Sequence, residues 1–259
     1  MLYSKNARVY AAARSQEKAE KAIEDIKQAV PSSAGELLFL SLDLADLTTI
    51  RASAEQILAK ESKLDVLFNN AGVMMPDAKT KSAQGYELQL GVNNVGTFMF
   101  TKLLAPLLVA TARKAPPDSV RVVWVSSSAA NAPSGPTNGV DMKNLDYHND
   151  KGSLFKYSVS KAGNFLHSAE FARRYSADGV VSVALNPGNL NSDLWRTQGR
   201  AASVFLKSFF LHPVVYGAYT ELFAGLSPDV TMERLGPSDW GKCRAVSRAY
   251  LYVYQSIAR

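Results

Sequence analysis

The stretch VRVVWVSSS, Val120–Ser128, is the part of this sequence that best indicates the fold. Its first six residues are apolar apart from Arg121, and a continuous apolar run is typical of a parallel strand buried on both faces. The three serines that follow mark the carboxyl end of the strand. Four further segments predict strands in the same way: Ala7–Ala13, Glu36–Leu42, Leu64–Phe68 and Val180–Leu185.

Helical segments separate these predicted strands along the chain. Ser15 is a suitable N-cap for the first helix, and Pro31 lies just beyond its end. The predicted helices are Gln16–Val30, Leu47–Lys60, Tyr86–Arg113 and Leu154–Tyr175. Strands that alternate with helices predict an α/β fold, a doubly wound parallel sheet with helices on both faces. There is no internal repeat and no linker, so residues 1–259 are expected to form a single domain.

The composition argues against several classes of function. The net charge is +6, but the Lys and Arg residues are scattered, so we expect no nucleic-acid partner. The single cysteine, Cys243, cannot form an internal disulfide and fits a reducing compartment. The 3 histidines are widely separated, so no metal site is expected. With neither a signal peptide nor an uncharged bilayer-spanning run visible, we expect a cytoplasmic protein without a transmembrane segment.

Candidate chemical residues follow the predicted strands at their carboxyl ends. In a doubly wound sheet ligands bind at this edge, and four separate strands bring polar or glycine residues to it. They are Asp43, then Asn70 with Gly72, then Ser126–Ser128, and finally Pro187 with Gly188.

Tyr157 and Lys161 form a possible acid/base pair on one predicted helix. Residues four apart share a helix face, separated by about 6 Å along the axis. A nearby ammonium favours the phenolate, so we expect a lowered pKa for Tyr157, which would suit proton transfer at neutral pH. The alternative, for the pair alone, is a solvated helix face.

Taken together and in this order, these features resemble the short-chain dehydrogenase/reductase family, in particular its retinol-dehydrogenase-like branch and the fungal relatives of that branch. The resemblance extends from about Ala7 to about Pro228. Its markers are the turn Asn69–Gly72, the segment Val92–Gly96, the strand end Val125–Ser127, Tyr157-x-x-x-Lys161, and Asn186-Pro187-Gly188 followed by Ser192.

The resemblance implies a role for each of four catalytic residues. Tyr157 would give a proton to a carbonyl or accept one from an alcohol, and Ser127 would hydrogen-bond the substrate oxygen. Lys161 would hold the nicotinamide ribose and lower the pKa of Tyr157. Asn93 would support Lys161 through a backbone kink and a bound water. The alternatives are a strand-end turn for the serines and a helix-interior polar residue for Asn93.

The resemblance also implies the residues that contact the cofactor. Asp43 and Leu44 would line the adenine, and Asn70 and Gly72 would pass beneath its ribose. Ser192 would bond the carboxamide. Leu190 would contribute a backbone contact, Pro187 and Gly188 would belong to the same segment, and Tyr157 and Lys161 would complete the set.

Arg14 bears on which cofactor is used. NAD-preferring sites of this kind carry a carboxylate after the strand, and here that position is Ala13. Arg14 could instead pair with a 2′-phosphate through charge-assisted hydrogen bonds. This favours NADP(H) over NAD(H); the alternative is a solvated surface arginine.

Two departures from the family pattern accompany the resemblance. Neither a first strand nor its glycine-rich, phosphate-binding turn precedes Ala7, and residues 229–259 form a divergent tail. We therefore expect an N-terminally truncated chain with a doubly wound, Rossmann-like sheet that lacks its first strand, from an incomplete or mis-spliced gene model or a decayed copy of the gene. The chain would then lack the contacts that hold the pyrophosphate of the cofactor.

The expected substrate is lipophilic. Residues 191–228 occupy the position of the family's substrate lid, and Ala202–Leu226 is rich in aromatic residues, which favours a lipophilic ketone, aldehyde or alcohol. The same segment could touch a membrane surface, and a homo-oligomer is left open. The sequence thus predicts an NADP(H)-dependent oxidoreductase that interconverts a carbonyl and an alcohol, the alternative being a catalytically impaired remnant that only binds.

Overall fold

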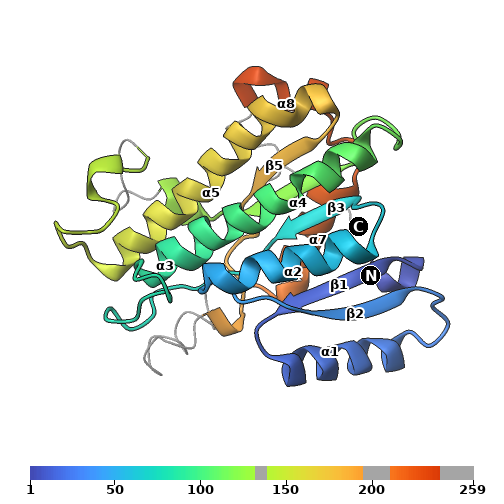
Figure 1. The fold of residues 1–259 in the computed structure, drawn as a ribbon, viewed down its shortest axis with the longest axis horizontal. Coiled ribbons are helices and arrows are strands. Elements are labelled where there is room, and N and C mark those ends of the chain that lie inside the picture. The colour runs from blue at the N-terminus through green and yellow to red at the C-terminus, as the bar shows by residue number, and fades with distance from the viewer. Residues whose placement is uncertain (132–138, 195–210, 240–259) are drawn as a thin grey trace.

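The computed structural model describes residues 1–131, 139–194 and 211–239. Strands and helices alternate along the chain as the sequence predicts, and all strand pairs are parallel (Figure 1). The strands are β1 (Arg8–Ala13), β2 (Glu36–Ser41), β3 (Val66–Asn69), β4 (Arg121–Val125) and β5 (Val181–Leu185). The α-helices are α1 (Gln16–Ala29), α2 (Leu47–Lys60), α3 (Leu88–Leu90), α4 (Thr97–Ala112), α5 (Ser153–Tyr175), α7 (Val214–Leu226) and α8 (Met232–Asp239).

The ends of several helices agree with the residues that cap them. The side chain of Ser15 accepts a hydrogen bond from the Lys18 N–H at the start of α1, so the predicted N-cap is confirmed. Asp46 caps α2 by accepting from the Thr48 N–H at 3.0 Å. Each cap satisfies a backbone donor that the first helical turn leaves without a partner.

The long helix predicted over Tyr86–Arg113 contains a π-helical segment, Gly91–Gly96, between α3 and α4. Close backbone contacts accompany it. A Cβ at Gly96 would lie 2.3 Å from the Leu44 carbonyl oxygen, and one at Gly163 of α5 would lie 1.8 Å from Asn94 Oδ1. The wider turn therefore lies where α5 and the loop after β2 approach most closely.

The strands form two ladders rather than one. β1 pairs with β2, starting at Arg8↔Glu36, and β3, β4 and β5 form a three-stranded sheet in that order. Within the described residues no ladder joins β1 to β3. The described strands therefore leave an interval between β1 and β3, and the expectation that a strand is missing before Ala7 stays a prediction.

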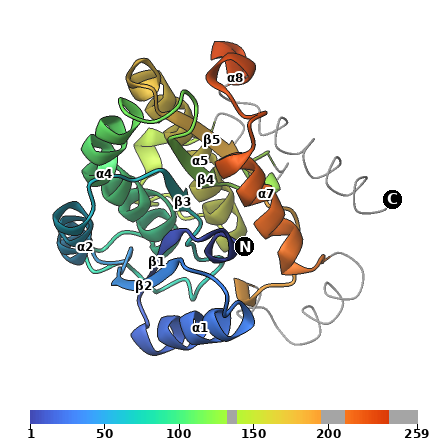
Figure 2. The ribbon, with the colours of Figure 1, turned by 90° about the vertical axis from the view of Figure 1, so that its right-hand side faces the viewer.

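The core has layers on both sides of the three-stranded sheet. Val122 and Trp124 of β4 face α4 and α5, whereas Val123 and Val125 face α7 and α8, so the continuous apolar strand is buried on both faces as predicted. Figure 2 shows α4 and α7 on opposite sides of β3, β4 and β5, with α1 next to the β1–β2 pair. A further cluster centred on Ile50 and Leu104 joins β2 to α2 and α4.

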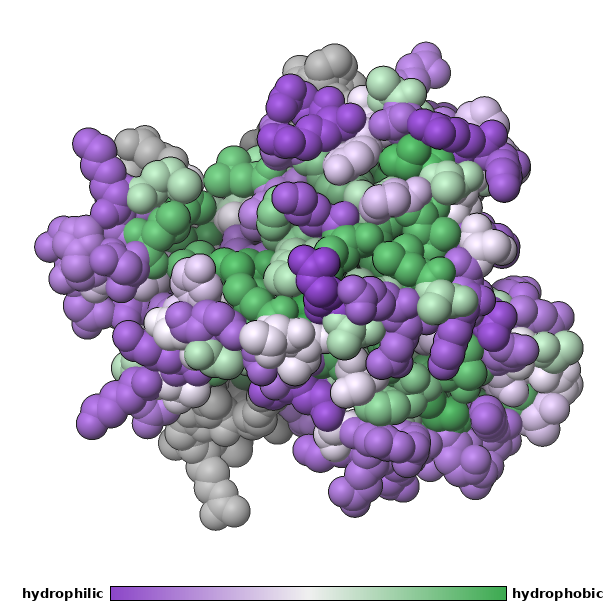
Figure 3. Space-filling model, viewed as in Figure 1, coloured by the Kyte–Doolittle hydropathy of each residue, from purple (hydrophilic) through white to green (hydrophobic). Residues whose placement is uncertain are grey.

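Among the described helices one, Leu88–Ala112, is long and apolar enough by composition to cross a membrane, although half of its apolar window is buried inside the molecule. The sequence prediction concerned uncharged apolar runs long enough to span a bilayer, and Leu88–Ala112 is not one of them because it contains Lys102. The helix packs against α2 and the sheet, as the core helix of a globular domain does. Apolar surface is visible over α4 and α5 in Figure 3, where Phe98, Leu154 and Leu166 are exposed.

Candidate active site

The candidate catalytic residues lie together at the carboxyl ends of β3 and β4. Tyr157 and Lys161 occupy one buried face of α5, with exposed fractions of 6% and 5%. Ser127 is the second residue after β4, and its hydroxyl lies close enough to the Tyr157 side chain to lower the pKa of the phenol through hydrogen bonding. Tyr157, Lys161 and Ser127 are therefore brought together as predicted, and the solvated helix face is excluded for the pair.

Lys161 reaches from α5 to the end of β4. Its Nζ donates to the Val125 carbonyl oxygen at 2.9 Å and lies 5.8 Å from the centroid of the Tyr157 ring. A Cβ at Gly72 would lie 3.6 Å from this Nζ, an ordinary contact distance, and 3.0 Å from Asn93 Oδ1, so the tight contact of the turn after β3 is with Asn93. Burial lowers the pKa of Lys161 to about 8, and the charge of Glu221 acts in the opposite direction.

The expected pKa shift of Tyr157 is wrong in direction. Burial raises the pKa of this phenol, and the hydrogen bond from Ser127 opposes the rise only in part. The sequence places Lys161 one turn away but does not show that the phenol is buried. In the folded chain Tyr157 is therefore a protonated phenol, which suits a group that donates a proton to a substrate rather than one that accepts a proton from it.

Asn93 lies in the π-helical segment, so the expected backbone kink is present. Its side chain links the site to the turn after β3: Oδ1 accepts from the Val73 N–H at 2.8 Å, and Nδ2 donates to Val73 O and Ser160 Oγ, both at 2.9 Å. The side chain is 1% exposed, so these bonds hold the turn firmly against α5.

Further polar side chains, to which the sequence analysis gave no individual role, fix α5 in place. Ser126 Oγ donates to the Lys161 carbonyl oxygen at 2.7 Å, and Asn94 Nδ2 donates to the Ser160 carbonyl oxygen at 2.7 Å. Asn164 Nδ2 donates to the same Val125 oxygen as Lys161, at 3.1 Å. Of these residues, Asn164 could have been indicated by its spacing along α5, since Tyr157, Lys161 and Asn164 fall on one face.

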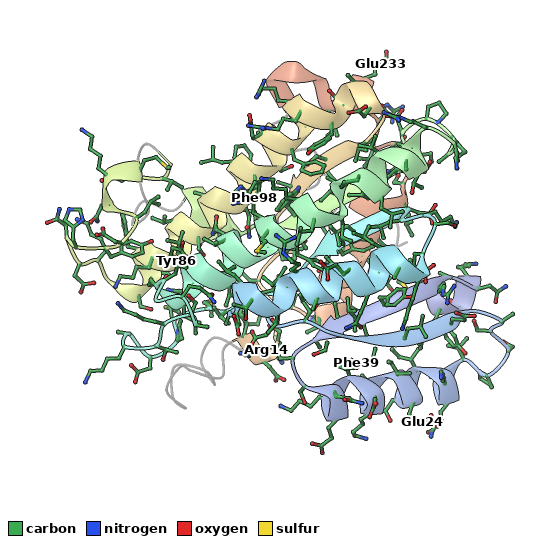
Figure 4. The ribbon with its side chains drawn as sticks, in the orientation of Figure 1. Arg14, Glu24, Phe39, Tyr86, Phe98 and Glu233 are labelled. Atoms are coloured by element: carbon green, nitrogen blue, oxygen red, sulfur yellow. The ribbon has the colours of Figure 1, made fainter. Side chains whose placement is uncertain are left out.

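The residues expected at the adenine end of the cofactor differ in their surroundings: some are exposed and one is packed in the core. Arg14 is exposed at the carboxyl end of β1, where Figure 4 labels it. Asp43 forms a local turn by accepting from the Ala45 N–H at 2.9 Å, and Asn70 is exposed. Leu44 differs from the expectation, because its side chain is packed in the core cluster around Ile50.

The segment after β5 carries the remaining candidates. Gly188 has a φ of 90°, which favours glycine, and its N–H donates to Asn186 Oδ1 beside Pro187. Leu190 pairs with His212, and Ser192 Oγ accepts from the Leu194 N–H at 3.4 Å. Part of the expected lid (195–210) and much of the tail (240–259) lie outside the described residues.

Among the described residues, no group of 3 or more His, Cys, Asp or Glu is placed to hold a metal ion. A doubly wound parallel sheet with a tyrosine, a serine and a lysine at its carboxyl edge defines a Rossmann-like oxidoreductase. The family model for the short chain dehydrogenases matches residues 1–138. The chain belongs to the short-chain dehydrogenase/reductase family, a family of NAD(P)-dependent oxidoreductases.

Curated fungal relatives agree with this assignment. The chain is 57% identical over 242 residues to a short-chain dehydrogenase/reductase of Phomopsis amygdali, a match that spans 93% of this chain and 72% of that protein. A second, from Neocamarosporium betae, is 44% identical over 263 residues and matches 100% of this chain and 76% of its own length.

Solved structures share the fold. The RhlG/NADP active-site complex of Pseudomonas aeruginosa has a TM-score of 0.64 at 22% identity, with 87% of this chain and 82% of that chain covered. The 3-oxoacyl-[acyl-carrier protein] reductase of Brucella melitensis, in complex with NAD, also has a TM-score of 0.64, at 19% identity and with 87% and 83% covered.

Proposed function

We propose that this chain is an NADP(H)-dependent oxidoreductase that interconverts a carbonyl and an alcohol on a lipophilic small molecule, with Tyr157 as the acid/base. The observation that carries the proposal is the burial of Tyr157 and Lys161 on one face of α5, with the Ser127 hydroxyl close enough to influence the pKa of the phenol. A substrate oxygen placed between the two hydroxyls would meet a proton donor and a second hydrogen bond.

The residues at the two ends of the candidate cofactor site fit a dinucleotide. Lys161, with two N–H groups beyond its bond to Val125, and the loop Pro187–Ser192 would hold the nicotinamide end. Arg14, exposed after β1 and without a neighbouring carboxylate in the sequence, would bind a 2′-phosphate. Asp43, Asn70 and Gly72 would lie along the adenine ribose. The cofactor supplies or accepts the hydride.

The chain's own residues would manage the proton and the charge. Tyr157 holds its proton because burial raises its pKa, and it would release that proton only to an oxygen that is gaining negative charge. Ser127 would donate to the same oxygen. Asn93, bonded to both the Val73 backbone and Ser160, would keep the turn after β3 and the helix α5 at a fixed separation.

Replacement of Tyr157 by phenylalanine tests this proposal. Tyr157→Phe should abolish NADPH-dependent reduction of lipophilic ketones while leaving the NADPH dissociation constant nearly unchanged. Tyr147→Phe is the matched control, because the Tyr147 hydroxyl is also buried but has no hydrogen-bond partner within the described residues. Retention of more than a few per cent of the rate in Tyr157→Phe would refute the assignment of the acid.

A binding protein without turnover is the second candidate, and the interval between β1 and β3 favours it. We propose that no glycine-rich strand-to-helix turn of the described residues fills this interval. The pyrophosphate would then lack backbone N–H donors, each worth about 1.5–3 kcal/mol to a charged partner.

Calorimetric titration of the purified chain with NADPH separates the two candidates. Without the backbone donors, binding should be no tighter than about millimolar, with no turnover of carbonyl substrates. A micromolar dissociation constant together with turnover would establish the enzyme and exclude the binding protein.

We also propose a homo-oligomer and a cytoplasmic location for this protein. The exposed Phe98, Leu154 and Leu166 on α4 and α5 support a homo-oligomer. A cytoplasmic location with peripheral membrane contact would suit a lipophilic substrate, and the retention of the chain in the soluble fraction after membrane sedimentation would test it.

A further inference from the structure

Helix α7 holds one carboxylate between two points of very close contact. Gly217, Glu221 and Gly225 are four residues apart and so share one face of α7. A Cβ at Gly217 would lie 2.2 Å from Leu190 Cδ1, and one at Gly225 would lie 2.4 Å from Phe68 Cζ. The face that carries Glu221 is therefore pressed between the end of β3 and the loop after β5.

This place is the edge of the sheet at which the candidate cofactor residues gather. Phe68 precedes the turn that contains Asn70 and Gly72, and Leu190 is itself one of the expected cofactor contacts. Glu221 is half-buried, and burial raises the pKa of its carboxyl to about 7, while the charge of Lys161 acts to lower it. Lys161 lies across the sheet edge on α5, beside Gly72.

We propose that Glu221 is the counter-ion of Lys161, a positioning residue that keeps the buried lysine protonated across the carboxyl edge of the sheet. The ammonium has a neutral carbonyl, Val125 O, as its hydrogen-bond partner, and it is almost fully buried. A buried ammonium without an opposite charge nearby loses its proton readily. The carboxylate on α7 therefore raises the pH at which Lys161 becomes neutral.

The charged groups considered next are not placed to act as the counter-ion of Lys161. The strands against which α7 packs contribute one ionisable side chain, Arg121, whose guanidinium bonds the carbonyl oxygens of Ala224 and Ser227 at the far end of the helix. On α5 the neighbour of Lys161 is Tyr157, which is neutral at physiological pH because burial raises its pKa. Asp193, beyond Leu190, is exposed to solvent.

The inference can be tested without any cofactor. In protein labelled with ¹³C at lysine Cε, the Lys161 resonance is assigned from the spectrum of Lys161→Arg and followed as a function of pH. Glu221→Gln, which keeps the shape of the side chain and removes its charge, should lower the titration midpoint of Lys161 by about one pH unit or more. Glu221→Asp should restore most of the shift, and Glu233→Gln on the surface of α8 should leave the midpoint unchanged.

An unchanged Lys161 midpoint in folded Glu221→Gln would overturn the proposal. If that variant does not fold, the unaltered chain still gives the answer. There the Lys161 resonance should show a second inflection near the titration of Glu221, and a curve with one inflection would contradict the pairing.

The consequence for cofactor binding rests on the proposed function. If a charged Lys161 is needed to hold the nicotinamide ribose, a one-unit fall in its pKa should weaken NADPH binding about fivefold at pH 8 and hardly at all at pH 6. A moved titration midpoint with unchanged NADPH binding would contradict the assigned role of Lys161, while leaving the proposed electrostatic coupling of Glu221 to Lys161 intact.

Discussion

Arg121 offers the sharpest test of how the sheet and α7 are held together. It begins β4 and is only 4% exposed. Its guanidinium donates three hydrogen bonds to backbone carbonyl oxygens: to Asp118 at 2.8 Å, to Ala224 at 3.0 Å and to Ser227 at 2.8 Å. One side chain thus joins the start of a central strand to the last turn of α7, where helix carbonyls lack partners.

The expected cost of Arg121→Met follows from these bonds. Each charge-assisted hydrogen bond contributes about 1.5–3 kcal/mol, and the loss of their donor leaves buried carbonyls without a partner. Against this, the variant no longer buries a charge, a cost that lowers the pKa of Arg121 and amounts to several kcal/mol. We expect a net loss of about 3 kcal/mol in the free energy of unfolding, since methionine fills most of the volume.

Equilibrium unfolding in urea measures this loss. Trp124 lies on the same strand and is 0% exposed, so its fluorescence reports directly on this sheet. The matched control is Arg234→Met, which removes an exposed arginine paired with Asp229 and should change stability by less than about 0.5 kcal/mol. A loss for Arg121→Met below about 1 kcal/mol, or equal to that of the control, would refute the argument that these bonds secure α7.

Three further predictions follow from other contacts. Gly163→Ala should lower the free energy of unfolding by about 1–3 kcal/mol in a urea titration, because its Cβ would meet Asn94 Oδ1, whereas Gly152→Ala has nothing within 4 Å and should change it little. Burial lowers the pKa of His167 to about 4, so the unfolded chain binds more protons than the folded chain between pH 6.5 and 4. The free energy of unfolding should therefore fall as the pH drops through this window. If His167→Phe showed the same fall in stability at acid pH, it would contradict this. Arg14→Ala should weaken NADPH binding by about 1.5–3 kcal/mol in calorimetry and barely affect NADH, and equal losses for both would show that Arg14 does not contact the 2′-phosphate.

Strand and helix positions could be predicted because the signals are local. The apolar runs and the caps at Ser15 and Pro31 set limits that agree with the structure to within one or two residues in most elements. The grouping of Ser127, Tyr157 and Lys161 could be predicted as well, since parallel strands bring their carboxyl ends to one edge.

The features that were missed depend on contacts between distant segments. The π-helical turn at Gly91–Gly96 accompanies the close approach of Leu44 and α5, which no local pattern contains. Glu221 was not singled out, because nothing near it in the sequence indicates which face of α7 packs against the sheet. The pKa of Tyr157 was predicted in the wrong direction because burial is a property of the folded chain.

The interval between β1 and β3 has a consequence for how the molecule opens. The β1–α1–β2 unit has few buried residues: Ala19 is the one buried residue of α1, Leu40 is the one of β2, and β1 has none. By contrast, every residue of β4 and β5 is buried. A unit with so few buried contacts opens at a lower free energy than the rest, without global unfolding. In native-state hydrogen exchange the amides of β1 and β2 should therefore exchange as a group well before those of β4 and β5, and a protease should first cut the chain near Pro31.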